Sequence, residues 1–165
     1  MGHSITTLVL NGDCDAAAMQ RYDLRPIDLG FRLQLCHIDH YYAACWQKKN
    51  GAHELLPLDL PDLPAIFPRE GVLLQIAREV LGTPEPQFAV IMTEFMGGVG
   101  RQWAQVYTGG EIAGDSLHTI NHALRFLGVV SQPGIDEFDT VGLDRIRHNP
   151  EYLEKYVDLA DELGV

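Results

Sequence analysis

The sequence has little positive charge. Its 165 residues include 12 lysines and arginines but 23 aspartates and glutamates, so the net charge is −11 with the histidines neutral. This imbalance disfavours nucleic acid as a partner, because proteins bind the phosphate backbone largely through basic side chains that displace its counterions. It suits a basic protein partner instead.

Cysteines and long apolar runs are also scarce. Cys14, Cys36 and Cys45 form an odd, scattered set without a CxxC motif, so we expect no disulfide framework and a reducing, cytoplasmic environment. No segment is apolar over the length of a membrane span, and Met1–Leu10 lacks the basic start of a signal peptide. We therefore expect no membrane association.

The remaining composition is that of one folded domain. The chain is 46% hydrophobic and 21% charged, as globular proteins are, and it is long enough to bury a substantial core. We expect a single domain over residues 1–165 of the α+β class, with a mainly antiparallel sheet of four to five strands. Three to four helices are expected to pack largely on one face of this sheet. The oligomeric state stays open.

The chain is organised around a predicted β-hairpin from Gln87 to Tyr107. Phe88–Phe95 is almost entirely apolar and rich in strand-forming residues, and Arg101–Tyr107 follows after a glycine-rich loop. The predicted register places Glu94 opposite Gln102. A shift of one residue would exchange the two faces of each strand, because side chains alternate with a period of two.

Periodicity and turn residues predict the other elements. Strands are expected at Ser4–Leu10 and Phe31–Ile38, a short strand or helix at Tyr41–Gln47, and helices at Ala16–Tyr22, Pro68–Leu81, Asp115–Leu127 and Pro150–Leu163. The first helix should be capped by Asp13 or Asp15. Gly82 should end the second helix, and Asn149 should cap the last one.

The glycine-rich loop and the carboxylate before it form the first candidate site. The loop contains three glycines, Gly97, Gly98 and Gly100. They suit a tight or bulged turn, and a phosphate-binding turn is less favoured because neither a helix nor a Lys–Ser/Thr pair follows. Glu94, close to Arg101, is expected to bond Gln102 or the backbone; the functional alternatives are an acid/base group and a small-ligand site under the loop.

His118 and His122 form the second candidate site. They lie four residues apart in a predicted helix, so both rings can face the same way, as in metal-binding pairs, with Glu111 or Asp115 adding a carboxylate. A metal-dependent hydrolase is therefore the alternative function. The glutamate of an HExxH motif is missing, however, and Arg125 would repel a cation. Two exposed histidines are the favoured interpretation, and we expect no cofactor.

Two further polar clusters admit a chemical interpretation that we favour less. Asp13 and Asp15 follow the first strand and carry the oxygen ligands that Mg²⁺ prefers, although a helix cap explains them as well. His37, Asp39 and His40 would suit a base that activates a cysteine. Nothing in the sequence brings a particular cysteine to them.

Three motifs resemble a family of small bacterial proteins of unknown function. They are EFMGGVGRQ at Glu94–Gln102, INHALRFLGV at Ile120–Val129 and DEFDTVGLDRIRH at Asp136–His148. The resemblance covers about Gln87–Tyr152, and Met96 departs from the aromatic residue expected in the first motif. Some members look like immunity proteins of bacterial toxin systems, so the resemblance implies an immunity-type inhibitor. The family has no established activity that the resemblance could carry over to this chain.

Together, these features favour a non-catalytic, cytoplasmic protein-binding module with a basic partner. The candidate binding residues are Glu94, Gly97, Gly98, Gly100, Arg101, Gln102, Asn121 and Arg125. The structural alternative is that the polar residues of the three motifs hold the fold together. In that network, Arg145 and Arg147 pair with Asp136 or Glu137.

Overall fold

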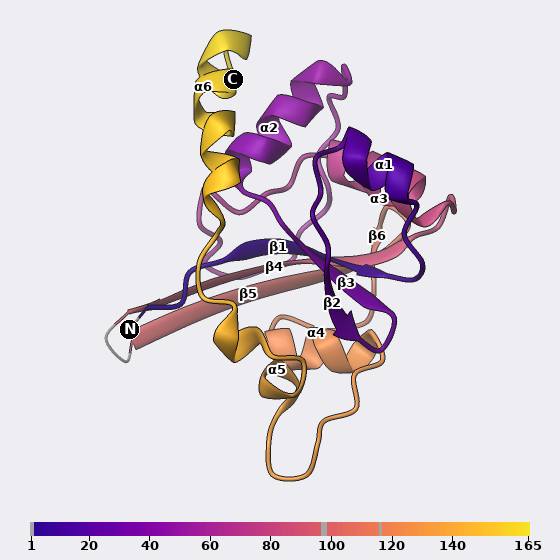
Figure 1. The fold of residues 1–165 in the computed structure, drawn as a ribbon, viewed down its shortest axis with the longest axis vertical. Coiled ribbons are helices and arrows are strands. Elements are labelled where there is room, and N and C mark those ends of the chain that lie inside the picture. The colour runs from indigo at the N-terminus through magenta and orange to yellow at the C-terminus, as the bar shows by residue number, and fades with distance from the viewer. Residues whose placement is uncertain (1, 97–98, 116) are drawn as a thin grey trace.

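A computed structural model describes residues 2–96, 99–115 and 117–165 (Figure 1). Its strands form one antiparallel sheet in the order β2-β3-β1-β4-β5-β6. They are β1 (Thr6–Asn11), β2 (Ile27–Gly30), β3 (Leu33–His37), β4 (Gln87–Met96), β5 (Val99–Thr108) and β6 (Glu111–Ile112). The predicted α+β class and antiparallel sheet are confirmed. The short edge strands β2 and β6 add to the strands that the sequence predicted.

Helices cover both faces of the sheet. The first face carries α1 (Ala16–Arg21), α2 (His40–Lys49), α3 (Val72–Leu81) and α6 (Lys155–Leu163), and the second carries α4 (Ile120–Phe126) and the short α5 (Glu137–Thr140) (Figure 1). Side chains of β1 alternate between two apolar cores, with Leu8 under the first group of helices and Val9 under α4. The larger helices thus lie mainly on one face, as predicted. In the part of the chain described, no helix is long and apolar enough to cross a membrane.

The ends of α1 and α3 follow from single residues. Asp15 caps α1, because its carboxylate accepts a hydrogen bond from the N–H of Ala18 at 3.0 Å. Gly82 ends α3 in the left-handed conformation, at φ 65°. Both of these predictions are confirmed. The start of α3 was predicted four residues too early. The chain before Val72 is not helical, because Arg69 and Gly71 form backbone hydrogen bonds with Leu56 and Glu54.

The last helix is present, but it lacks the predicted cap. A 3₁₀ turn, Glu151–Glu154, precedes α6. Asn149 lies before that turn and binds the sheet instead, since its side-chain oxygen accepts from the N–H of Thr6 at 3.1 Å and its NH₂ donates to the carbonyl of Ile38 at 3.4 Å. The sequence could not reveal this role, because it depends on residues more than a hundred positions away.

The central hairpin is present, but its predicted register was wrong by one residue. β4 and β5 pair Met96 with Val99, so Glu94 lies opposite Arg101 and not opposite Gln102. The predicted register required a loop of three residues, 97–99. The strands are instead joined by the two residues 97 and 98, a length that favours tight hairpins. Gly97 and Gly98 themselves lie outside the described residues.

The shift of register exchanges the two faces of β5. Trp103 and Tyr107 join the core under α1, α2 and α3, where Tyr107 stacks on Phe88 with ring centroids 5.1 Å apart. The smaller Ala104 and Val106 face α4 on the other side. The large aromatic rings therefore lie in the core beneath α1, α2 and α3.

The hairpin from β2 to β3 contains two residues in an uncommon conformation. Gly30 pairs with Leu33, so Phe31 and Arg32 form the turn, and their φ angles are 55° and 62°. The predicted strand from Phe31 therefore starts two residues too early. A left-handed conformation costs about 1–2 kcal/mol for a residue with a side chain, and such turns normally use asparagine and glycine.

Candidate functional site

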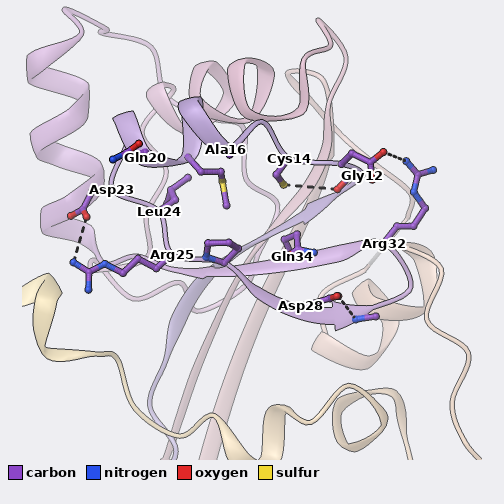
Figure 2. A pocket seen from close by; sticks show the side chains of 14 residues that line it. Gly12, Cys14, Ala16, Gln20, Asp23, Leu24, Arg25, Asp28, Arg32 and Gln34 are labelled. Carbon is purple, nitrogen blue, oxygen red and sulfur yellow. Dashed lines mark hydrogen bonds and ion pairs between the residues drawn. The ribbon is translucent and has the colours of Figure 1, made fainter.

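A cavity of about 760 Å³ lies between α1 and the hairpin of β2 and β3, and we call it the α1 pocket (Figure 2). This volume is typical of pockets that bind ligands. Ala16, Met19 and Gln20 of α1 form one wall, and Asp28 and Gln34 of the two strands form the floor. This pocket was not predicted from the sequence.

The pocket forms where the helix layer ends over β3. Side chains of this strand alternate between the two faces of the sheet, so Gln34 and Cys36 point to the same face. Cys36 is buried beneath the helices, whereas Gln34 is partly exposed in the pocket. The change from apolar to polar residues along one strand face was the signal in the sequence that could have located this site.

Charged side chains lie at both ends of the α1 pocket. Arg25 is 3.8 Å from Asp23 at one end, and Arg32 is 3.8 Å from Asp13 at the other (Figure 2). These separations are too long for hydrogen bonds. Among the described residues, neither guanidinium group donates a hydrogen bond, and the Gln34 amide also has no partner. The pocket therefore offers several donors that the protein itself does not use.

Two of the carboxylates in the pocket already have partners. Asp23 accepts from the ammonium group of Lys155 at 2.6 Å and from the hydroxyl of Tyr156 at 2.9 Å. Asp28 accepts from the N–H of Gly30 at 2.8 Å. The carboxylate of Asp13 is almost fully exposed at the rim. Lys155 thus neutralises Asp23, whereas Asp28 and the exposed Asp13 keep negative charge in the pocket and at its rim.

The cysteines near the pocket are poor nucleophiles. Burial, reinforced by the charge of Asp13, raises the pKa of the Cys14 thiol, and burial raises the pKa of Cys36 to about 12. His37 lies on the opposite face of β3 from Cys36, and Asp39 caps α2 by accepting from the N–H of Tyr42 at 2.7 Å. The structure does not assemble a histidine-activated cysteine from these residues.

The predicted site at the end of the central hairpin is exposed. The Glu94 side chain is 48% exposed, and its carboxylate lies 3.7 Å from the guanidinium of Arg101. Arg101 in turn lies over the ring of Trp103, 5.2 Å from its centroid. Because Glu94 is in contact with water, its charge does not need a buried partner.

The other predicted residues of this hairpin have structural contacts. The side-chain oxygen of Gln102 accepts from the N–H of Ile120 at 2.8 Å, so it fixes the start of α4. Gly100 leaves room for the ring of Phe95, since a Cβ atom there would lie 1.5 Å from that ring. The predicted small-ligand site under the loop includes Gly97 and Gly98, which lie outside the described residues.

Asn121 and Arg125 connect α4 to α5. The Asn121 side chain donates to Asp136 at 3.0 Å and accepts from the N–H of Phe138 at 2.8 Å. Arg125 forms two hydrogen bonds, of 3.2 and 3.3 Å, with the carboxylate of the buried Glu137 and lowers its pKa. These contacts explain the INHALR and DEF motifs as parts of one structural network.

The network uses a different arginine from the one expected. We predicted that Arg145 and Arg147 would pair with Asp136 or Glu137, and no such ion pair is present among the described residues. Arg125 takes that position because α4 carries it directly beside α5. The candidate binding residues thus form two groups, one at the end of the central hairpin and one on α4, connected through Gln102.

The two histidines do not share a helix. α4 begins only after Thr119, whose hydroxyl accepts from the N–H of His122 at 3.2 Å, so His118 lies in the preceding loop. The His118 ring is 3.0 Å from the carboxylate of Asp59 instead. Within the described residues, no group of three histidines, cysteines or acidic residues is arranged to hold a metal ion.

The chain has no significant match among protein-family models, curated proteins or solved structures. The resemblance of its three motifs to a bacterial family therefore stays a prediction. The surface and the pocket of this chain itself are therefore the basis for proposing its function.

Proposed function

We propose that this chain is a non-catalytic binding module that contacts a basic protein through the outer side of its C-terminal helix. The observation that carries the proposal is a row of exposed acidic residues, which we call the acidic stripe: Glu151, Glu154, Asp158, Asp161 and Glu162. Within the described residues, none of them forms an ion pair. The charge of −11 is thus concentrated in part on one helix.

The acidic stripe lies opposite the buried side of the helix. Glu151, Glu154 and Asp158 are spaced three or four positions apart, and the adjacent Asp161 and Glu162 follow Asp158 at three and four positions, which is the repeat of one helix face. Tyr156 and Ala160 lie on the other face and are buried in the core, where α6 packs beside α2 (Figure 1). Lys155, the basic residue of α6, is paired with Asp23. No positive charge on α6 is therefore left to neutralise the stripe.

The acidic stripe is electrostatically unfavourable for the isolated chain. Asp158 and Glu162 are separated by one helical turn, and like charges at this spacing destabilise a helix by about 0.2–0.5 kcal/mol. Asp161 and Glu162 also lie in the last turn, where the helix dipole favours cations and where α6 has no basic residue. Charges that destabilise their own helix in this way are expected at binding surfaces, where the opposite charge of a partner compensates for them.

The chemistry of the partner follows from this surface. A basic face on the partner would be attracted over a distance, which raises the rate of association and makes it sensitive to salt. The resemblance to a family with immunity-type members supports inhibition of a toxin as the biological role.

A capture experiment tests the proposal. The intact protein is immobilised and exposed to a bacterial lysate at low and high salt, beside the stripe variant Asp161→Lys/Glu162→Lys. The control, Glu111→Lys/Asp115→Lys, changes the net charge equally at exposed positions outside α6. We expect a basic partner that binds wild type and control at low salt and dissociates at high salt. Equal capture by the stripe variant, or no partner at either salt, would contradict the proposal.

A further inference from the structure

The α1 pocket adjoins the C-terminal helix that carries the acidic stripe. Asp23, at one end of the pocket, is bonded to Lys155 and Tyr156 of α6. Arg25, at the same end, lies over the ring of Tyr152 with its guanidinium carbon 3.8 Å from the ring centroid. The pocket thus borders the start of α6, where Glu154 of the acidic stripe directly precedes Lys155 in the chain.

We propose that the α1 pocket binds an extended peptide segment of this partner protein. The inference rests on the proposed function and assigns a second contact to the same complex. It is carried by the cavity, by the unused hydrogen-bonding groups inside it and by its continuity with α6. Each of these points to the same kind of ligand.

The chemistry of the lining matches a polypeptide backbone. Gln20 and Gln34 each carry a carboxamide, which donates and accepts hydrogen bonds as a peptide group does. Arg25 and Arg32 add donors for carbonyl or carboxylate oxygens, while Asp13 offers an exposed acceptor for a basic side chain. The lining thus combines donors and acceptors along its whole length (Figure 2).

The apolar part of the pocket separates a peptide from a simple anion. Met19 and Leu24 are buried residues that also line the cavity, and they offer contacts to aliphatic side chains between the charged ends. A small anion would use the arginines alone and would be repelled by Asp13 and Asp28. A segment with alternating polar and apolar groups uses the whole surface, as peptides do in recognition grooves.

The turn beside the pocket is built from residues that suit an interface. Phe31 is 42% exposed and Arg32 lines the pocket, and aromatic residues and arginine are enriched among residues that dominate binding energy. Both have left-handed φ angles that asparagine or glycine would adopt at lower cost. The chain thus retains large side chains at this turn against the preference of the backbone.

Selection of peptides from a phage-displayed random library, panned on the full-length protein, tests this inference. Arg32→Gly removes the guanidinium and relieves the left-handed backbone, so this variant is expected to fold. The control is Arg69→Ala, an exposed arginine outside the pocket. We expect selected peptides to bind wild type and control alike and to lose about tenfold or more in affinity on Arg32→Gly, as expected for a residue that dominates binding.

Cys14 reports the position of the bound peptide. It lines the pocket and is partly exposed, whereas Cys36 and Cys45 are buried, so iodoacetamide should modify Cys14 first. A peptide in the pocket should slow this modification. Failure to select any peptide, or selected peptides that bind Arg32→Gly normally or leave Cys14 unprotected, would overturn the inference.

The inference and the proposed function can fail separately. The stripe variant leaves the α1 pocket intact, so it should still bind the selected peptides. If capture of a partner depends on the acidic stripe but no peptide is selected, the pocket inference is wrong and the proposed function stands. If peptides protect Cys14 while capture does not depend on the stripe, the proposed function is wrong, and so is the assignment of the peptide to that partner.

Discussion

Reversing the charge at the end of α6 should stabilise the protein. In the stripe variant Asp161→Lys/Glu162→Lys, two repulsions with Asp158 become attractions, at spacings of three and four residues. Each reversal is worth about 0.4–1 kcal/mol, twice the energy of one pair. Two cations also replace two anions in the last turn of the helix, where each favourable charge contributes about 0.3–1 kcal/mol.

Because these side chains are exposed and screened by salt, we expect a net gain of about 1–2 kcal/mol at low ionic strength. For a chain of this size, that gain corresponds to a rise in Tm of about 3–6 °C. The control Glu111→Lys/Asp115→Lys relieves the same overall charge without changing α6. Its Tm should rise less than that of the stripe variant.

Thermal unfolding followed by circular dichroism, at low and high salt, measures both effects. The advantage of the stripe variant over the control should shrink as salt is added, because screening weakens the repulsion that it removes. A stripe variant that melts at or below the wild-type temperature at low salt would refute the argument. That result would show that repulsion within the acidic stripe does not destabilise the folded chain.

Three further predictions concern single sites. Arg32→Gly should raise the free energy of unfolding in urea by about 1 kcal/mol, because glycine tolerates φ 62°; a loss of stability would show that the side chain contributes more than its backbone costs. Burial lowers the pKa of His37, which is 6% exposed, so the unfolded chain binds a proton that the folded chain resists. Stability should therefore fall below pH 6.5 by at most about 1.4 kcal/mol per unit, and it should fall less in His37→Phe. Zn²⁺ and Mg²⁺ should leave the Tm unchanged, since His118 contacts Asp59 and lies outside the helix of His122; a metal-dependent rise would revive the hydrolase alternative.

Local features of the fold were predictable because their causes lie within a few residues. Asp15 caps the helix that begins at the next residue, and Gly82 ends the helix that stops just before it. The alternation along β3 and the two faces of α6 also follow from short-range periodicity. For this reason, the α+β class and the acidic side of the last helix could be read from the sequence.

Features that depend on distant contacts were not predictable in this way. The register of β4 and β5 depends on the number of residues in the loop, and the apolar pattern fits either choice because both faces of β4 are buried. Asn149 resembles a helix cap until Thr6 and Ile38 are placed beside it. The partner of Glu137 likewise depends on how α5 meets α4.

The α1 pocket was missed for a related reason. Its walls come from a helix and a hairpin whose distance apart is set by the packing of both on the sheet. Two sequence signals were nevertheless present: Gln34 is polar on an otherwise apolar strand face, and Phe31–Arg32 occupies a turn without asparagine or glycine at those positions. The interpretation of Phe31 as part of a strand concealed the second signal.

The proposal that the acidic stripe recognises a basic protein is tested most directly by the kinetics of complex formation with the captured partner. We predict that the association rate of the wild-type protein falls steeply with increasing salt. Reversing Asp161 and Glu162 should lower the rate at low salt by at least about tenfold and remove most of its salt dependence. An association rate that is the same for wild type and stripe variant at every salt concentration would contradict the proposal.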